Sequence, residues 1–115
     1  MKKLLVLCAV LGFAIAVVAA DKGPAVIDLS KQFGVTKTTK KAVEFPHELH
    51  QSKNQCTECH LSAEGGKELK NTKTGEKLVL GEIKGVKNAA HDDFCWPCHV
   101  AKNVPSGKSC NKCHN

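Results

Sequence analysis

Three short segments of this 115-residue chain repeat one chemical pattern, C-x-x-C-H. They occupy residues 56–60, 95–99 and 110–114. Two thiols at this spacing can add to the two vinyl groups of one porphyrin, and the adjoining imidazole can bind its iron. The pattern is the attachment sequence of a c-type haem, so three copies predict three haem c groups. The predicted covalent attachment residues are Cys56, Cys59, Cys95, Cys98, Cys110 and Cys113.

The supply of histidines matches the demand of three haem irons. Each iron has two axial positions, and the chain has six histidines. Met1 is the only methionine and tyrosine is absent, so other common axial ligands are lacking. We therefore predict two imidazoles on every iron, although the count alone would also allow a spare histidine on the surface. The predicted iron ligands are His47, His50, His60, His91, His99 and His114.

The start of the chain reads as a secretory signal peptide. Lys2 and Lys3 precede an apolar run at residues 4–18, which ends in the small residues Ala19 and Ala20. This order predicts cleavage after Ala20 and export to the periplasm. A retained membrane anchor is the alternative, but the run is shorter than the roughly 20 residues that span a bilayer. We expect no stable membrane insertion.

Residues 21–115 are then one small domain whose charge suits a haem protein. The full chain carries a formal charge of +6, and loss of Lys2 and Lys3 leaves +4. The propionates of bound haems would compensate this charge, while lysines near haem edges would attract acidic partner proteins. No basic run with interleaved aromatic residues predicts nucleic-acid binding. The domain has few large apolar side chains, so we expect little folding without cofactor.

The pattern of residues predicts short elements around the motifs. Strand-like runs at residues 25–29 and 42–45 predict a small antiparallel ribbon with a long polar connection. A short helix over residues 46–51 would place His47 and His50 on one face, where they must serve two different haems.

Residues 61–90 form the longest gap between motifs, and residues 86–100 are expected to be partly helical. Gly65 and Gly66 should break a helix that follows His60. Residues 69–80 should form a hairpin with its turn near Thr74 and Gly75. The gap segment would shield a haem face or dock a partner. Phe94 and Trp96 flank Cys95 and should pack on porphyrin faces.

Zinc binding and thiol–disulfide exchange are the two other uses that cysteines at this spacing commonly have. Paired cysteines commonly bind zinc, but zinc sites do not require a histidine directly after every second cysteine. Thiol–disulfide exchange is suggested by the segment at residues 95–98, but no βαβ pattern surrounds it. Haem attachment accounts for all three motifs and for the export signal.

The order of these residues resembles class III multihaem cytochromes c, and among them the triheme cytochrome c7 group, relatives of cytochrome c3. The similarity rests on Phe45-Pro46-His47-x-x-His50 before the first motif, on His91 shortly before the second, and on a closely following third. It implies a small, mostly irregular and α-helical fold with an N-terminal two-stranded ribbon and a core made largely of haem.

The resemblance also implies which histidines share a haem, where spacing alone leaves other pairings open. His47 would pair with His60. His50 would pair with His99, and His91 with His114.

The function implied is that of a low-potential periplasmic electron carrier rather than an enzyme. It would be a monomer that exchanges electrons with inner-membrane and outer-membrane cytochromes or reductases, in anaerobic respiration of metals or sulfur. The alternative is a small multihaem reductase, which would need one iron with an open coordination site. A haem-storage or filament protein, with little reversible electron exchange, is a third possibility.

Overall fold

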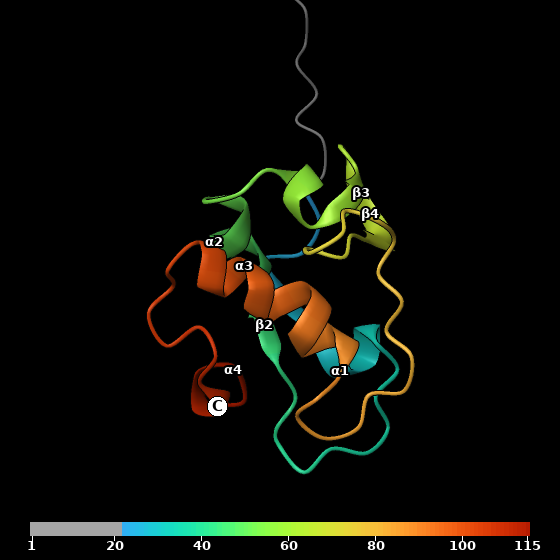
Figure 1. The fold of residues 1–115 in the computed structure, drawn as a ribbon, viewed down its shortest axis with the longest axis vertical. Helices are drawn as coiled ribbons and strands as arrows, with labels where there is room; N and C mark the ends of the chain where they lie inside the picture. Colours follow the sequence, from blue (N-terminus) through green and yellow to red (C-terminus); the bar gives the residue numbers. More distant parts are fainter. Residues whose placement is uncertain (1–21) are drawn as a thin grey trace, which may run out of the picture.

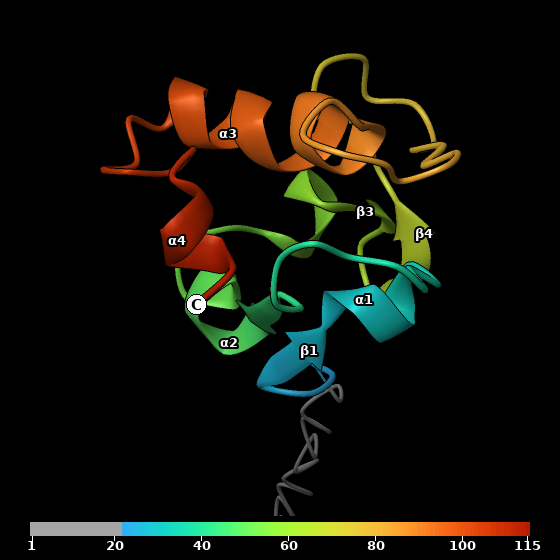
Figure 2. The same cartoon turned by 90° about the horizontal axis from the view of Figure 1, so that it is seen from below.

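The computed structural model describes residues 22–115, so the predicted signal peptide lies outside the described residues. Figure 1 follows the chain through ten short elements, and Figure 2 views them from below. In Figure 2, α3 (Trp96–Ala101) runs along one side, while β1 (Val26–Asp28), α1 (Leu29–Gln32) and α2 (His47–Gln51) lie on the opposite side. The β3–β4 hairpin and α4 (Cys110–Cys113) lie at opposite ends between them. Among the described residues, no helix is long and apolar enough to span a membrane.

The predicted N-terminal ribbon is confirmed. β1 pairs antiparallel with β2 (Glu44–Pro46), and Ile27 lies opposite Phe45. Their connection also contains α1, which the sequence pattern did not predict. The Asp28 carboxylate accepts hydrogen bonds from the backbone N–H groups of Ser30 and Lys31 at 3.0 and 3.2 Å, so it caps the first turn of that helix.

The helix predicted over residues 46–51 is present as α2, with Pro46 in the capping position before it. Residues 52–55 form no further helix, and the chain then enters a 3₁₀ turn, η1 (Cys56–Glu58). The Glu58 carboxylate accepts a hydrogen bond from the backbone N–H of Gln55 at 2.8 Å, which closes this turn.

The helix expected after His60 is absent, and that prediction was wrong. β3 (His60–Ser62) follows instead and pairs antiparallel with β4 (Gly65–Leu69). Gly65 and Gly66 have φ of +86° and +102°, a region that glycine enters without steric cost, so they turn the chain back on itself. The glycines thus make a hairpin rather than end a helix.

The next turn was predicted correctly, but its strands are minimal. Gly75 has φ of +78° and its N–H donates to the Asn71 carbonyl at 2.8 Å. A single antiparallel bridge joins Lys70 to Lys77. The turn is docked by Thr72, whose N–H donates to the Asp93 carbonyl at 2.8 Å.

The partly helical segment near the second motif is also confirmed. A π-helix, η2 (Ala90–Cys95), leads directly into α3. π-Helical turns are rare in proteins, and those that occur are often found at functional sites. This one contains His91 and ends on the first cysteine of the motif.

The described residues form almost no apolar core of their own. Leu78 is the only buried apolar side chain among them, at 8% exposure. Large apolar side chains such as Val79, at 78% exposure, remain open to solvent. Polypeptide packing alone therefore supplies little of the burial that stabilises a domain of this size.

Candidate haem-binding site

The six histidines lie in three facing pairs. The ring centroids of His47 and His60 are 6.3 Å apart with planes at 74°. Those of His50 and His99 are 6.1 Å apart at 17°. Those of His91 and His114 are 6.3 Å apart at 82°. These are the same pairs that the family resemblance implies, and iron ligation by them stays a prediction.

The separation within each pair fits two ligands on opposite sides of one metal. A bound ring nitrogen lies about 2.0 Å from a first-row metal and roughly 1.1 Å from its own ring centroid, so two opposed imidazoles have centroids about 6.2 Å apart. Packed rings span a range that includes this distance, from 4.2 Å for Phe45 and His50 to 6.1 Å for Phe45 and His47. The separation therefore fits an iron between two imidazoles, and its weight comes from its recurrence in all three pairs.

α2 carries the first ligand of two different pairs. Pro46 precedes the helix in the capping position, and its carbonyl accepts a hydrogen bond from Nδ1–H of His50 at 2.9 Å. His47 and His50 occur one helical turn apart, yet their partners are His60 in β3 and His99 in α3. The predicted sharing of one helix between two haem sites therefore agrees with the ring geometry.

Hydrogen bonds prepare most of these rings as ligands. Nδ1 of five histidines lies within hydrogen-bond distance of a backbone carbonyl, and because a carbonyl only accepts, Nδ1 must carry the proton. The lone pair of Nε2 is then free for a metal, as in metal-binding histidines generally. The five bonds are His47 to Pro24 (2.9 Å), His50 to Pro46 (2.9 Å), His91 to Val86 (2.7 Å), His99 to Gly107 (2.7 Å) and His114 to Lys41 (2.7 Å).

His60 is the exception. Its Nδ1 is buried and has no hydrogen-bond partner. His60 opens β3, whereas His99 lies inside α3, so the two proximal histidines have different local backbones. The C-x-x-C-H sequence therefore does not determine which group forms a hydrogen bond with Nδ1 of its histidine.

Electrostatics favour neutral imidazole at the centre of the site. Burial lowers the pKa of His50, and the neighbouring rings of His99 and His47 lower it further, against the opposing effect of the Pro46 carbonyl. The neutral form is the one that can bind a metal through nitrogen.

Three of the motif cysteines are poorly suited to thiolate chemistry. Burial raises the pKa of the Cys95 thiol to about 12, and it also raises the pKa of Cys59 and Cys113. Reactive or metal-binding thiols require a lowered pKa. Among the described residues, no group of three or more His, Cys, Asp or Glu side chains is placed to hold a metal ion.

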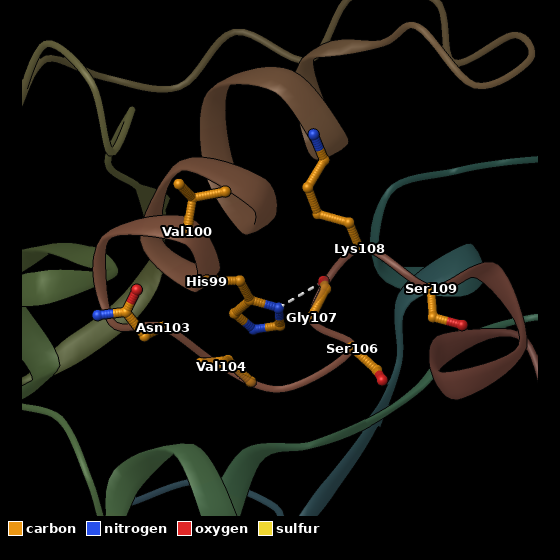
Figure 3. A pocket seen from close by; sticks show the side chains of 8 residues that line it. All are labelled: His99, Val100, Asn103, Val104, Ser106, Gly107, Lys108 and Ser109. Atoms are coloured by element: carbon orange, nitrogen blue, oxygen red, sulfur yellow. Dashed lines mark hydrogen bonds between the residues drawn. The ribbon is translucent and has the colours of Figure 1, made fainter.

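The loop after α3 is a functional element that the sequence pattern did not reveal. Figure 3 shows His99 and Gly107 facing each other, joined by the 2.7 Å hydrogen bond. A Cβ atom on Gly107 would lie 2.8 Å from both Cβ and Nδ1 of His99, so only glycine fits. The same residues line an open pocket of about 390 Å³ beside the ring. In the sequence, a glycine between a serine and a lysine carries no signal of this close approach.

Asn88 is a second residue that sequence reasoning missed. It is the only buried polar residue of the described chain, and its side-chain oxygen accepts a hydrogen bond from the His91 backbone N–H at 3.1 Å. Asn88 lies two residues before η2 and accepts from the N–H three positions further on, and asparagine just before a helical segment is a typical capping pattern that could have indicated this role.

The paired imidazoles, the attachment motifs and the small ribbon-and-helix scaffold together define a multihaem cytochrome of the c type. The class III cytochrome c family model matches residues 24–115, and the chain belongs to this family. It is 35% identical over 81 residues to a protein named cytochrome c3 from Desulfuromonas acetoxidans, a stretch covering 70% of this chain and 93% of that relative. No solved structure matches the chain. Membership of this family makes the chain a multihaem electron-transfer protein.

Proposed function

We propose that the protein is a periplasmic electron carrier with three covalently attached haem c groups, each bound by two histidines. The observation that carries this proposal is the set of three imidazole pairs with centroids 6.1–6.3 Å apart. Each pair includes the histidine of one C-x-x-C-H motif, so attachment and ligation converge three times. The haems, when bound, supply the redox centres of the protein.

The side chains around the pairs support electron transfer over catalysis at an iron. Two imidazoles fill both axial positions, which leaves none for a substrate. Nδ1–H bonds to backbone carbonyls fix five of the rings, so little rearrangement should accompany a change in charge. Histidine ligation without methionine also favours low potentials.

The extended apolar faces of the haems would supply the burial that the polypeptide lacks. Among the described residues, Leu78 is the only buried apolar residue, whereas seven large apolar side chains are exposed. We expect the chain without haem to be unfolded, because burial of apolar surface is the main favourable term in folding.

We further propose export and partnership with other redox proteins. The signal at residues 1–20 supports cleavage after Ala20 and transfer to the periplasm, where the mature domain would act as a monomer. Its lysines suit acidic surfaces on inner-membrane donors and on outer-membrane cytochromes or terminal reductases. By analogy with the family, the pathway is anaerobic respiration of metals or sulfur.

The test is the mass and spin state of the purified holoprotein. We expect the intact mass of residues 21–115 plus three haems, only low-spin iron in the ferric form, and no binding of carbon monoxide by the reduced form at neutral pH. His50→Ala serves as the positive control, because it should open one iron and bind carbon monoxide at one haem only. Fewer than three haems would contradict the proposal. Carbon monoxide binding by the unaltered protein would favour the reductase alternative.

Electron paramagnetic resonance adds a finer test. The planes of His50 and His99 are nearly parallel, at 17°, whereas the other two pairs cross at 74° and 82°. Parallel axial imidazoles give a rhombic low-spin signal, and crossed ones give a signal with one very large g value. We expect one haem of the first kind and two of the second.

A further inference from the structure

Trp96 belongs to the second attachment motif but packs on a ligand of the third haem site. It is the only tryptophan of the chain and lies between Cys95 and Cys98. Its ring is parallel to that of His91, with centroids 4.7 Å apart and planes at 6°. The partner of His91 is His114, which belongs to the third motif.

The π-helix is what brings these two rings together. The backbone N–H of Trp96 donates to the carbonyl of His91, a bond that spans five residues. In an α-helix, residues five apart differ by about 140° around the axis and face different ways. The wider π-turn places them on one side. Thr72 satisfies the freed carbonyls of this turn, because its hydroxyl lies 2.9 Å from the Phe94 oxygen.

The loop after α3 adds a positive charge to this arrangement. Nζ of Lys108 lies 4.7 Å from the centroid of the Trp96 ring, within cation–π range. In Figure 3, Lys108 points away from His99, while the adjacent Gly107 faces it. In this loop, Gly107 contacts His99 directly. The next residue, Lys108, contacts the indole ring of Trp96, which in turn packs on His91.

We propose that Trp96 is a positioning residue for His91, and that Lys108 holds the indole in place. Hydrogen bonding to Val86 restrains the Nδ1 edge of His91, and stacking restrains its face. The second motif and its loop would therefore set the plane of a ligand serving the third motif. This inference rests on the proposed haem ligation, and it concerns how two haem sites are coupled through side chains.

The experiment compares Trp96→Leu, Trp96→Phe and Lys108→Gln in the three-haem protein. Proton NMR of the ferric form resolves the haem methyl groups, whose shifts depend on the plane of the axial imidazoles. Contacts with the side-chain protons of Cys110 and Cys113 identify the third haem. In Trp96→Leu, we expect its methyl shifts and its large g value to change, while the haem attached at Cys56 and Cys59 keeps its own.

Two variants separate positioning from simple packing. Trp96→Phe keeps an aromatic face and should restore most of the native methyl pattern. Lys108→Gln should give a smaller shift at the third haem and a more negative reduction potential there, because it removes a positive charge near the ferric state. Lys31→Gln is the matched control, since it removes the same charge from α1, where the lysine pairs with Asp28.

Unchanged methyl shifts, g values and potential at the third haem in Trp96→Leu would overturn the proposal. If Trp96→Leu does not incorporate all three haems, Lys108→Gln provides the test. The proposal is overturned when Lys108→Gln changes the methyl shifts and potential of the third haem no more than Lys31→Gln does. A failure of the proposed ligation would be seen earlier, as a missing haem or a high-spin iron in the unaltered protein. The two failures are therefore distinguishable.

Discussion

The first and second C-x-x-C-H motifs share a sequence pattern and differ in structure. In the first, a 3₁₀ turn precedes a β-strand, and Nδ1 of His60 is buried without a partner. In the second, a π-helix runs into α3, and Nδ1 of His99 donates to Gly107. The pentapeptide fixes the spacing of sulfur and nitrogen atoms. The segments around it decide the backbone conformation and how each imidazole is held.

The second motif is also the more connected one. α3 and its flanking residues contact His50 from α2, His91 from the π-helix and Glu58 from the first motif. His60 contacts His47, and the first motif otherwise leads into a hairpin at the edge of the molecule (Figure 2). We therefore expect the two motifs to differ in how much of the structure depends on them.

The largest expected effect comes from deleting one attachment site. The double variant Cys95→Ala/Cys98→Ala should lose one covalent haem and also alter the two remaining haems, because the segment that carries His99 and Trp96, the ring partners of His50 and His91, would lose its covalent anchor. Cys56→Ala/Cys59→Ala should lose one haem and leave the other two closer to native. Intact mass gives the haem count, and NMR of the haem methyl groups reports the remaining sites. Equal changes at the remaining haems in both variants would contradict the predicted difference between the two motifs.

The next largest effect is expected from substituting Gly107, which lies beside His99 of the second motif, and a smaller one from Gly65, which lies beside His60 of the first motif. Gly107→Ala forces a Cβ to 2.8 Å from His99 and disturbs the bond to Nδ1, so we expect a loss of about 3 kcal/mol of stability. Gly65→Ala places its Cβ 4.0 Å from His60, an ordinary contact, and only its φ of +86° is unfavourable, at about 1–2 kcal/mol.

Thermal denaturation of the two holoproteins measures this difference. Gly34→Ala is a suitable control, because its φ is +65° and nothing lies within 4 Å of the added Cβ. It isolates the backbone cost from any contact with a histidine. A Gly107→Ala protein as stable as Gly34→Ala would mean that the loop yields easily and does not restrain His99.

A smaller effect is expected in the reduction potentials. Donation from Nδ1–H to a carbonyl makes an imidazole a stronger ligand and stabilises ferric iron. His47 and His50 both have this bond at 2.9 Å, so with respect to this hydrogen bond the first and second haem sites differ only on the proximal side. One hydrogen bond contributes about 1 kcal/mol, which for one electron corresponds to about 40 mV.

We therefore expect the haem attached at Cys56 and Cys59 to have a less negative potential than that attached at Cys95 and Cys98. A potentiometric titration that is monitored by NMR measures the potentials of these two haems separately. The reverse order would show that the missing bond at His60 is outweighed by the charges and burial around each haem.

Much of this arrangement could be predicted from local patterns. The motifs, the ribbon from β1 and β2, and the helix carrying His47 and His50 each have a signature within a few residues. The wrong prediction of a helix after His60 arose because Gly65 and Gly66 are compatible with both a helix end and a hairpin turn. Pairing with β4 decides between them, and strand pairing is a non-local interaction.

The carbonyl partner of His114 could not be predicted for the same reason. The bond from His114 to Lys41 joins residues 73 positions apart, and nothing near either one indicates the other. The stacking of Trp96 on His91 is local, but it depends on a π-turn that differs from an α-helix by one residue. Hydrophobic periodicity does not distinguish the two.

The smallest expected effect concerns the ion pair that joins the two motifs. Nζ of Lys102, which directly follows α3, donates to the carboxylate of Glu58 at 2.6 Å. This bond, together with the backbone N–H of Gln55, lowers the pKa of Glu58 below its ordinary value. A carboxyl whose pKa is lower in the folded state stabilises the protein above its ordinary pKa, and this stabilisation is lost as the pH falls through the folded-state pKa.

Glu58→Gln should therefore reduce thermal stability slightly at neutral pH and flatten its decline in acid. Because the pair is exposed, the change should be small and should shrink in high salt. Lys102→Gln should remove the same contribution, and the double variant should lose no more than either single variant. Glu68→Gln, which breaks an exposed pair with Lys77 outside the motifs, provides the control. Additive losses from Glu58 and Lys102 would mean that the two motifs are held together by their imidazoles and haems, without help from this ion pair.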